Sequence, residues 1–113
     1  MSVHLESVLS RFSNPQKLFI DGEHVDAASK RFIDVINPAT GERLAQVHEA
    51  GPEDIDRAVA SARRAFKDPS WSRMDPSARE RLLLRVADLL DERAEEIGLV
   101  ESLNNGKTLR EGK

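Results

Sequence analysis

The second half of the chain repeats apolar residues at helical spacing, and this pattern limits the possible folds more than any other feature. Between residues 55 and 66 they recur as on one side of a helix: Ile55, Ala58, Val59, Ala62 and Phe66. A longer stripe follows: Leu83, Val86, Ala87, Leu90, Ala94 and Ile97, widened by Leu82 and Leu89. A few short strands and one other helix cannot cover so wide a stripe, so we expect a partner surface outside these residues.

Proline and acidic residues define the ends of these helices. Residues 51–54, Gly-Pro-Glu-Asp, predict a helix start, because proline suits the first helical position and acids complement the helix dipole. The spacing of Glu53 and Arg57 predicts an ion pair between them. Residues 68–69, Asp-Pro, end this helix, and residues 75–76, also Asp-Pro, start the next one.

Three features of the helical half concern packing. Trp71 is expected in the loop between the helices, where packing them together is favoured over stacking on a ligand. Residues 91–93 are expected to bend the second helix. Gly98 would weaken its continuation by about 1 kcal/mol relative to alanine.

The first half of the chain has the pattern of β-hairpins. In "KLFIDGEHVD", Asp21-Gly22 lies between two short apolar-bearing runs, which is a strong signal for a two-residue hairpin turn. "RFIDVI" and "RLAQV" predict two further strands, and "NPATGE" between them predicts a turn in which Gly41 takes a positive φ.

Composition narrows the classes of function. The chain has 113 residues, enough for one small domain, and a net charge of −3, which disfavours nucleic acid as a partner. The sequence has no apolar run of membrane-spanning length, and its first residues lack the pattern of a signal peptide, so a cytoplasmic location is expected. It has no cysteine, which excludes disulfides and thiolate chemistry within it.

The motif Gly106-Lys107-Thr108 matches the end of a phosphate-binding P-loop but lacks the rest of it. The first glycine of that motif would fall at position 101, which is Glu101, and the preceding element is a predicted helix instead of a strand. A helix C-terminus fits better, with Gly106 left-handed after Asn105 and with Lys107 near the negative end of the dipole. "TLREGK" then resembles the first turn of another helix.

The sequence offers no other chemical site. The three histidines, His4, His24 and His48, have no metal-ligand spacing. The serines of the inter-helix region have no neighbouring histidine to act as a base: Ser70, Ser72 and Ser77. We therefore predict no catalytic, cofactor-binding or metal-binding residue in this chain.

Five blocks in order resemble the N-terminal region of the NAD(P)-dependent aldehyde dehydrogenase superfamily. They are "LFIDGEHVDA", "INPATGERLAQV", "GPEDIDRAVASARRAF", "WSRMDPSARERLLLRVADLLDERAEEI" and "ESLNNGK". The resemblance runs from about residue 17 onward and is closest to phenylacetaldehyde and betaine-aldehyde dehydrogenases. It implies an α/β fold, with β-hairpins followed by two or three helices of an incomplete cofactor-binding domain.

The resemblance also implies an organisation and a reaction. Residues 1–16 would be a variable N-terminal segment, 17–50 the β-hairpin region and 51–113 the truncated helical start of the NAD(P)-binding domain. Family members oxidise an aldehyde to a carboxylic acid with NAD or NADP, using a cysteine nucleophile, a glutamate, an oxyanion-binding asparagine and a glycine-rich cofactor turn. All of these lie in family segments C-terminal to this chain, so none is expected here, and this chain alone is expected to bind no cofactor.

Two departures from the family pattern stand near the C-terminus. Many relatives have an acid where this chain has Asn104, and in some that acid helps to hold a structural monovalent cation, which the neutral amide does not favour. Many relatives also have proline where Thr108 stands.

Two hypotheses follow from these observations. In the first, the chain is a partial aldehyde dehydrogenase, inactive by itself, whose relatives form homodimers or homotetramers. In the second, it is a stand-alone interaction module that docks on another protein through the apolar helix face of Leu82, Leu83, Val86, Leu89 and Leu90. The partial enzyme is the favoured hypothesis.

Overall fold

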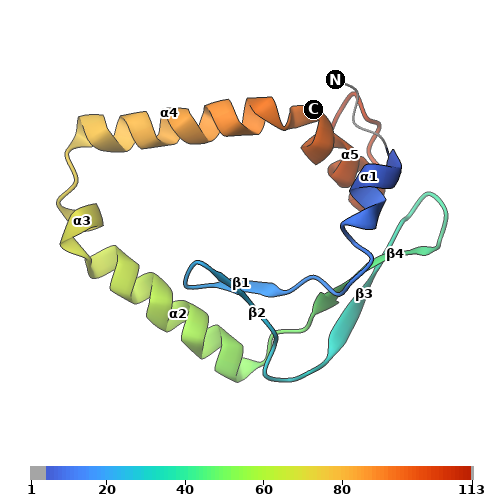
Figure 1. The fold of residues 1–113 in the computed structure, drawn as a ribbon, viewed down its shortest axis with the longest axis horizontal. Helices are drawn as coiled ribbons and strands as arrows, with labels where there is room; N and C mark the ends of the chain where they lie inside the picture. Colours follow the sequence, from blue (N-terminus) through green and yellow to red (C-terminus); the bar gives the residue numbers. More distant parts are fainter. Residues whose placement is uncertain (1–4, 113) are drawn as a thin grey trace.

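The fold consists of two β-hairpins followed by a series of helices (Figure 1). The structure, a computed structural model, describes residues 5–112. The helices are α1 (Leu5–Ser10), α2 (Pro52–Lys67), α3 (Pro69–Ser72), α4 (Pro76–Glu92) and α5 (Ala94–Asn105). The strands are β1 (Leu18–Ile20), β2 (Glu23–Val25), β3 (Phe32–Ile36) and β4 (Arg43–His48).

The first hairpin has the predicted two-residue turn. Strands β1 and β2 pair antiparallel, with Leu18 opposite Val25 and Ile20 opposite Glu23. The two turn residues both have positive φ, 56° at Asp21 and 79° at Gly22. This is the mirror-image turn whose twist matches that of the flanking strands. The prediction from Asp-Gly is confirmed.

The second hairpin is longer and irregular at its far end. Strands β3 and β4 pair antiparallel from Phe32–His48 to Ile36–Arg43, with a register shift between Val35 and Ile36. Gly41 in the connecting turn has φ 74°, as expected from "NPATGE". The chain before β1 joins this sheet as well, since Gln16 forms an isolated parallel bridge with Val47.

The helices begin and end close to the predicted positions. Pro52 and Pro76 are the first residues of α2 and α4, and the predicted bend at 91–93 is where α4 ends and α5 begins. Gly106, with φ 81°, is the left-handed cap of α5, and its N–H donates to the carbonyl oxygen of Ser102 at 3.0 Å. The element that precedes Gly106 is therefore a helix, whereas a P-loop follows a strand.

Several local expectations were wrong. Trp71 lies in the short helix α3 and not in a loop. The Asp68 carboxylate accepts a hydrogen bond from the Ser70 N–H at 2.8 Å and so caps this new helical turn. Arg57 forms its ion pair with Asp54, three residues before it, and not with the predicted partner Glu53. Asp75 occupies the N-cap position of α4, but its side chain makes no capping bond.

The C-terminal part contains contacts that the sequence did not predict, and the expected turn after Gly106 is present. Lys107 pairs with the Glu101 carboxylate at 3.2 Å. Gly98 is buried. A Cβ added to Gly112 would lie 2.7 Å from the Gly98 carbonyl oxygen, so α5 and the turn that follows it approach each other closely at this point. The residues that resemble a new helix form one turn, in which the Gly112 N–H donates to Thr108 O at 3.1 Å; Lys113 lies outside the described residues.

The elements are arranged in a ring and not in packed layers (Figure 1). The radius of gyration is 17.3 Å, against about 13 Å for a compact domain of this length. The accessible surface is 8862 Å², whereas roughly 6,200 Å² is expected for a compact protein of this mass. Among the described residues, Val8 and Ala27 are the only buried apolar side chains.

The two predicted helical stripes lie almost wholly in the open. In α2, Ile55 is 54% exposed and Phe66 73% exposed, while the opposite side of the helix faces the first hairpin. In α4 the whole stripe is exposed, from 40% at Leu89 to 61% at Leu83. The described residues therefore provide the stripes but not the surface that covers them.

We expect Gly22→Ala to loosen the first hairpin for a purely conformational reason. An added Cβ would meet no atom within 4 Å, so the change in free energy comes from the positive φ of Gly22 alone. The substitution should destabilise the closed hairpin by about 1–2 kcal/mol. The measurement is amide hydrogen exchange in residues 18–25, which should become faster. Glu23→Ala, one residue further in an extended strand, is the control, and equal exchange in both variants would contradict the assignment of the turn.

Candidate functional site

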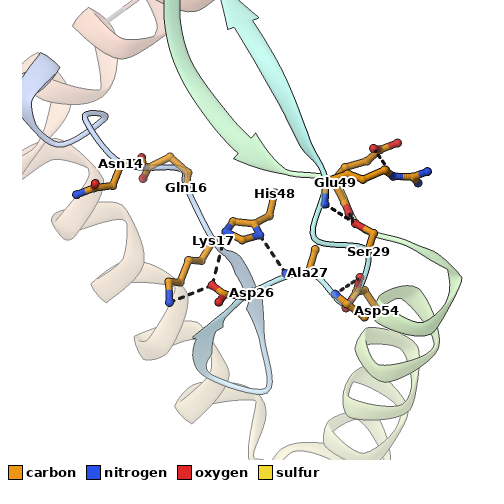
Figure 2. A network of polar contacts seen from close by, with 11 residues as sticks. Asn14, Gln16, Lys17, Asp26, Ala27, Ser29, His48, Glu49 and Asp54 are labelled. Atoms are coloured by element: carbon orange, nitrogen blue, oxygen red, sulfur yellow. Dashed lines mark hydrogen bonds and ion pairs between the residues drawn. The ribbon is translucent and has the colours of Figure 1, made fainter.

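A cluster of polar contacts lies where the loop after the first hairpin meets the start of α2 (Figure 2). At its centre Asp54 has no exposed surface. Its carboxylate accepts hydrogen bonds from the Ala28 N–H at 3.1 Å, the Gly51 N–H at 3.0 Å and the Arg57 guanidinium at 2.5 Å. One buried side chain therefore joins the loop to the N-terminus of the helix.

These contacts also control the ionisation of Asp54. The hydrogen bond from the Gly51 N–H contributes most to lowering its pKa, and those from Arg57 and Ala28 add to it, while desolvation opposes them. A buried carboxylate held by donors on several sides stays charged at neutral pH. Asp54 is thus a structural anion and not a proton donor.

A second set of contacts holds the loop against strand β4. The His48 ring is 9% exposed and lies between two loop groups, with Nδ1 accepting from the Ala27 N–H at 3.1 Å and Nε2 3.5 Å from Asp26 (Figure 2). Because Nδ1 is an acceptor, the neutral ring carries its proton on Nε2, facing Asp26. A hydrogen bond from Lys17 is the main cause that lowers the pKa of Asp26.

The loop is fixed at its other end too. The Ser29 hydroxyl donates to the Glu49 carbonyl oxygen at 2.6 Å, and Arg31 pairs with the Glu49 carboxylate at 2.9 Å. On the opposite edge of β4, Gln16 accepts from the His48 N–H at 2.9 Å. Four chain segments therefore meet within one small region, and their polar groups bond mainly to one another.

This arrangement can position the backbone, but it offers no reactive group to a substrate. Asp54 is closed off by its own donors, and His48 is engaged at both ring nitrogens. Within residues 5–112 no group of three His, Asp or Glu side chains is placed to bind a metal ion. We therefore describe the cluster as a structural junction.

A shallow hollow of about 310 Å³ lies between the first hairpin and α2. Asp21 bridges it, accepting from the Ser61 hydroxyl at 2.8 Å and from Arg64 at 3.0 Å. These two contacts lower the pKa of Asp21, with Ser61 the larger cause. The hairpin is thereby tied to the polar side of α2, which leaves the apolar side free.

Trp71 contributes to the joint between α3 and α4. The Arg79 guanidinium carbon lies 4.7 Å from the centre of the indole ring, and an Arg79 nitrogen donates to the Trp71 carbonyl oxygen at 3.0 Å. The expected role of Trp71 in packing the helical region is consistent with this contact, although the ring remains 38% exposed.

The remaining residues singled out from sequence do not converge. Asn104 is exposed on the last turn of α5, and the Ser70 N–H donates to the Asp68 carboxylate that caps α3. The His24 ring lies in tilted contact with Phe19 in the first hairpin, with 5.1 Å between the ring centres, and His4 lies outside the described residues. The sequence did not predict the junction; its one local signal is an acid three residues after Gly51, the spacing of a capping contact at a helix start.

The described residues define a mixed α/β fold in which α2 and α4 have exposed apolar faces. Residues 24–113 match the aldehyde dehydrogenase family. The chain belongs to this family, as the resemblance in its sequence indicated.

Individual relatives agree with this assignment. Aminoacetaldehyde dehydrogenase of Pseudomonas aeruginosa is 50% identical over 97 residues, which is 86% of this chain and 20% of that protein. Phenylacetaldehyde dehydrogenase of Pseudomonas fluorescens is 46% identical over 95 residues, 84% of this chain and 19% of that protein. The chain therefore spans about one fifth of the length of these relatives.

A solved structure shows the same backbone. Betaine aldehyde dehydrogenase of Staphylococcus aureus, in complex with NAD⁺, superimposes with a TM-score of 0.87 at 35% identity, covering 95% of this chain and 22% of that one. The open arrangement of elements is thus the arrangement found within a larger enzyme. Among residues 5–112, no helix combines the length and apolar character needed to cross a membrane.

We expect Asp54→Asn to release the junction. The amide is neutral and can no longer accept with two charged oxygens, so the Ala28 and Gly51 amides should exchange hydrogen roughly tenfold faster. Asp56→Asn, an exposed carboxyl in the same turn of α2, is the control. Unchanged exchange at both amides in the Asp54 variant would show that the carboxylate does not hold them.

The junction should also depend on pH. The folded pKa of Asp54 is below the unfolded value of 3.8, so its contribution to stability is present above that value and is lost as pH falls through the folded pKa. Amide protection at Ala28 and Gly51 should therefore decline below about pH 4. The Asp54→Asn variant should show less of this decline, and an identical pH profile would contradict it.

Proposed function

We propose that this chain is the scaffold segment of an NAD(P)-dependent aldehyde dehydrogenase, an enzyme that oxidises an aldehyde to a carboxylic acid. The observation that carries the proposal is the exposure of both helical stripes in a chain that matches the backbone of a much longer NAD⁺-bound relative. Apolar faces of this extent normally lie against another surface. The rest of the enzyme would supply that surface.

The proposed division of the chain follows its elements. Residues 1–16 form a variable N-terminal segment, 17–50 the hairpin region and 51–113 the helical start of the cofactor-binding domain. The junction around Asp54 would set the angle between the last two parts. Assembly into homodimers or homotetramers and a cytoplasmic location are proposed by analogy with the family.

The start of α2 does not fit the pyrophosphate of a nicotinamide dinucleotide. A dinucleotide pyrophosphate needs free amides at a helix N-terminus. At the start of α2 the Gly51 amide is already bonded to Asp54, whose negative charge would repel a phosphate. We therefore propose that the cofactor, the cysteine nucleophile and the catalytic glutamate belong to the remainder of the enzyme, and that this chain alone is inactive.

Reconstitution tests this proposal. The 113-residue chain, mixed with NAD⁺ and an aldehyde, should produce no NADH above the buffer rate, measured by absorbance. Adding a separately produced C-terminal remainder of the Pseudomonas aeruginosa relative should restore NADH production. NADH formation by the chain alone would refute the division of labour, and binding to an intact relative but not to the remainder would favour the interaction-module hypothesis.

Charge on the apolar face of α4 should prevent this reconstitution. We expect the double variant Leu83→Lys and Leu90→Lys to lower restored activity by at least about tenfold, because two ammonium groups would have to be desolvated on docking. Asp88→Lys introduces the same charge on the opposite side of α4 and is the matched control. Equal activity in both variants would show that the Leu83–Leu90 face is not the docking surface.

A further inference from the structure

The last turn of α5 contains a pair of residues with its own chemistry. Of the four asparagines in the chain, Asn14 and Asn37 precede proline, Asn104 precedes another asparagine, and only Asn105 precedes glycine. An asparagine side chain can be attacked by the backbone nitrogen of the next residue. Glycine offers that nitrogen without a Cβ to hinder it, whereas proline has no N–H to lose.

The structure holds both reacting groups in other contacts. The Asn105 amide nitrogen donates to the Glu101 carboxylate at 2.5 Å, and its oxygen accepts from the Lys107 N–H at 2.9 Å. The Gly106 N–H, which would supply the nucleophile, donates to the Ser102 carbonyl oxygen at 3.0 Å. Attack on the side chain requires this capped turn to open.

One further bond closes the turn. The Ser102 hydroxyl donates to the Lys107 carbonyl oxygen at 2.6 Å and so joins the helix to the residue after the cap. Gly106 also lies against the second hairpin, because a Cβ there would be 3.1 Å from Pro38 Cγ. Helix ends open with a small free energy, so the turn is closed for most but not all of the time.

We propose that Asn105–Gly106 is a site of spontaneous deamidation whose rate is set by the opening of the last turn of α5. Solvent hydroxide removes the Gly106 N–H proton, and the nitrogen forms a bond to Asn105 Cγ. The Cγ–Nδ2 bond breaks, ammonia leaves with a proton from water, and a cyclic imide remains. Water then opens either carbonyl of the imide and gives aspartate or isoaspartate, with no change in oxidation state.

The product cannot restore the original cap. Either form places a new carboxylate beside Glu101, with which the Asn105 amide was hydrogen-bonded, and like charges four residues apart destabilise a helix. Isoaspartate also adds a methylene to the backbone, which displaces the Gly106 N–H from Ser102. Deamidation is therefore a one-way loss of the original cap of α5.

Peptide mapping of the aged 113-residue chain tests the site. After incubation at 37 °C and neutral pH, tryptic peptide 94–107 should gain the mass of one amide-to-acid exchange at Asn105, and the isoaspartate form should separate chromatographically. Peptides containing Asn14 and Asn37 are internal controls. Asn105→Gln should abolish the change and Asn104→Gln should not.

Two conditions test the dependence on the turn. Guanidinium chloride should accelerate deamidation by roughly tenfold, as expected when a closed helix end is fully opened. Ser102→Ala should accelerate it several-fold in native buffer, while Ser61→Ala in α2 should not. The proposal would be overturned if the modification occurred elsewhere than at Asn105. It would also be overturned if the deamidation rate were the same in native buffer, in denaturant and in the Ser102 variant.

Discussion

The relative placement of the hairpins and the helices depends on the hydrogen bonds that the Asp54 carboxylate accepts. This carboxylate is fully buried, and it joins the loop at Ala28 to the start of α2 at Gly51. A charge buried in this way stabilises a structure only when its donors are all in place, and removing them leaves it uncompensated. Asp54, with Arg57 as its charge partner, is therefore the buried link between the hairpin half and the helical half, and the contacts of Asp21 with α2 form a second, exposed link.

The junction orders the backbone but does not supply a hydrophobic core. A chain of this length could bury a core, yet only Val8 and Ala27 are buried apolar residues among those described. The surface that a compact protein would remove from water lies instead on α2 and α4. Membership of the aldehyde dehydrogenase family and the superposition on a much longer relative give this surface a physical explanation, since the same elements pack within a larger molecule there.

The sequence predicted the local structure well, for reasons that can be given residue by residue. Asp21-Gly22 specified its turn because both positions need positive φ, and Pro52 and Pro76 fixed helix starts because proline suits only the first turn. One error concerns an ion pair: spacing predicted Glu53 as the partner of Arg57, but the guanidinium pairs with the buried carboxylate of Asp54. Spacing alone could not show which of the two neighbouring acids Arg57 binds.

By itself, therefore, the sequence determined the hairpins, the helix ends and the two apolar stripes, because turn geometry, capping and periodicity act between neighbouring residues. It also carried the five ordered blocks from which the family could be recognised. Only the tertiary structure decided that Asp54 and His48 hold the loop between the halves, because their partners are 20 or more residues away: His48 bonds to Ala27 and Asp54 to Ala28. It also decided that the stripe of α2 faces away from the first hairpin, because that hairpin binds the polar side of α2 through Asp21.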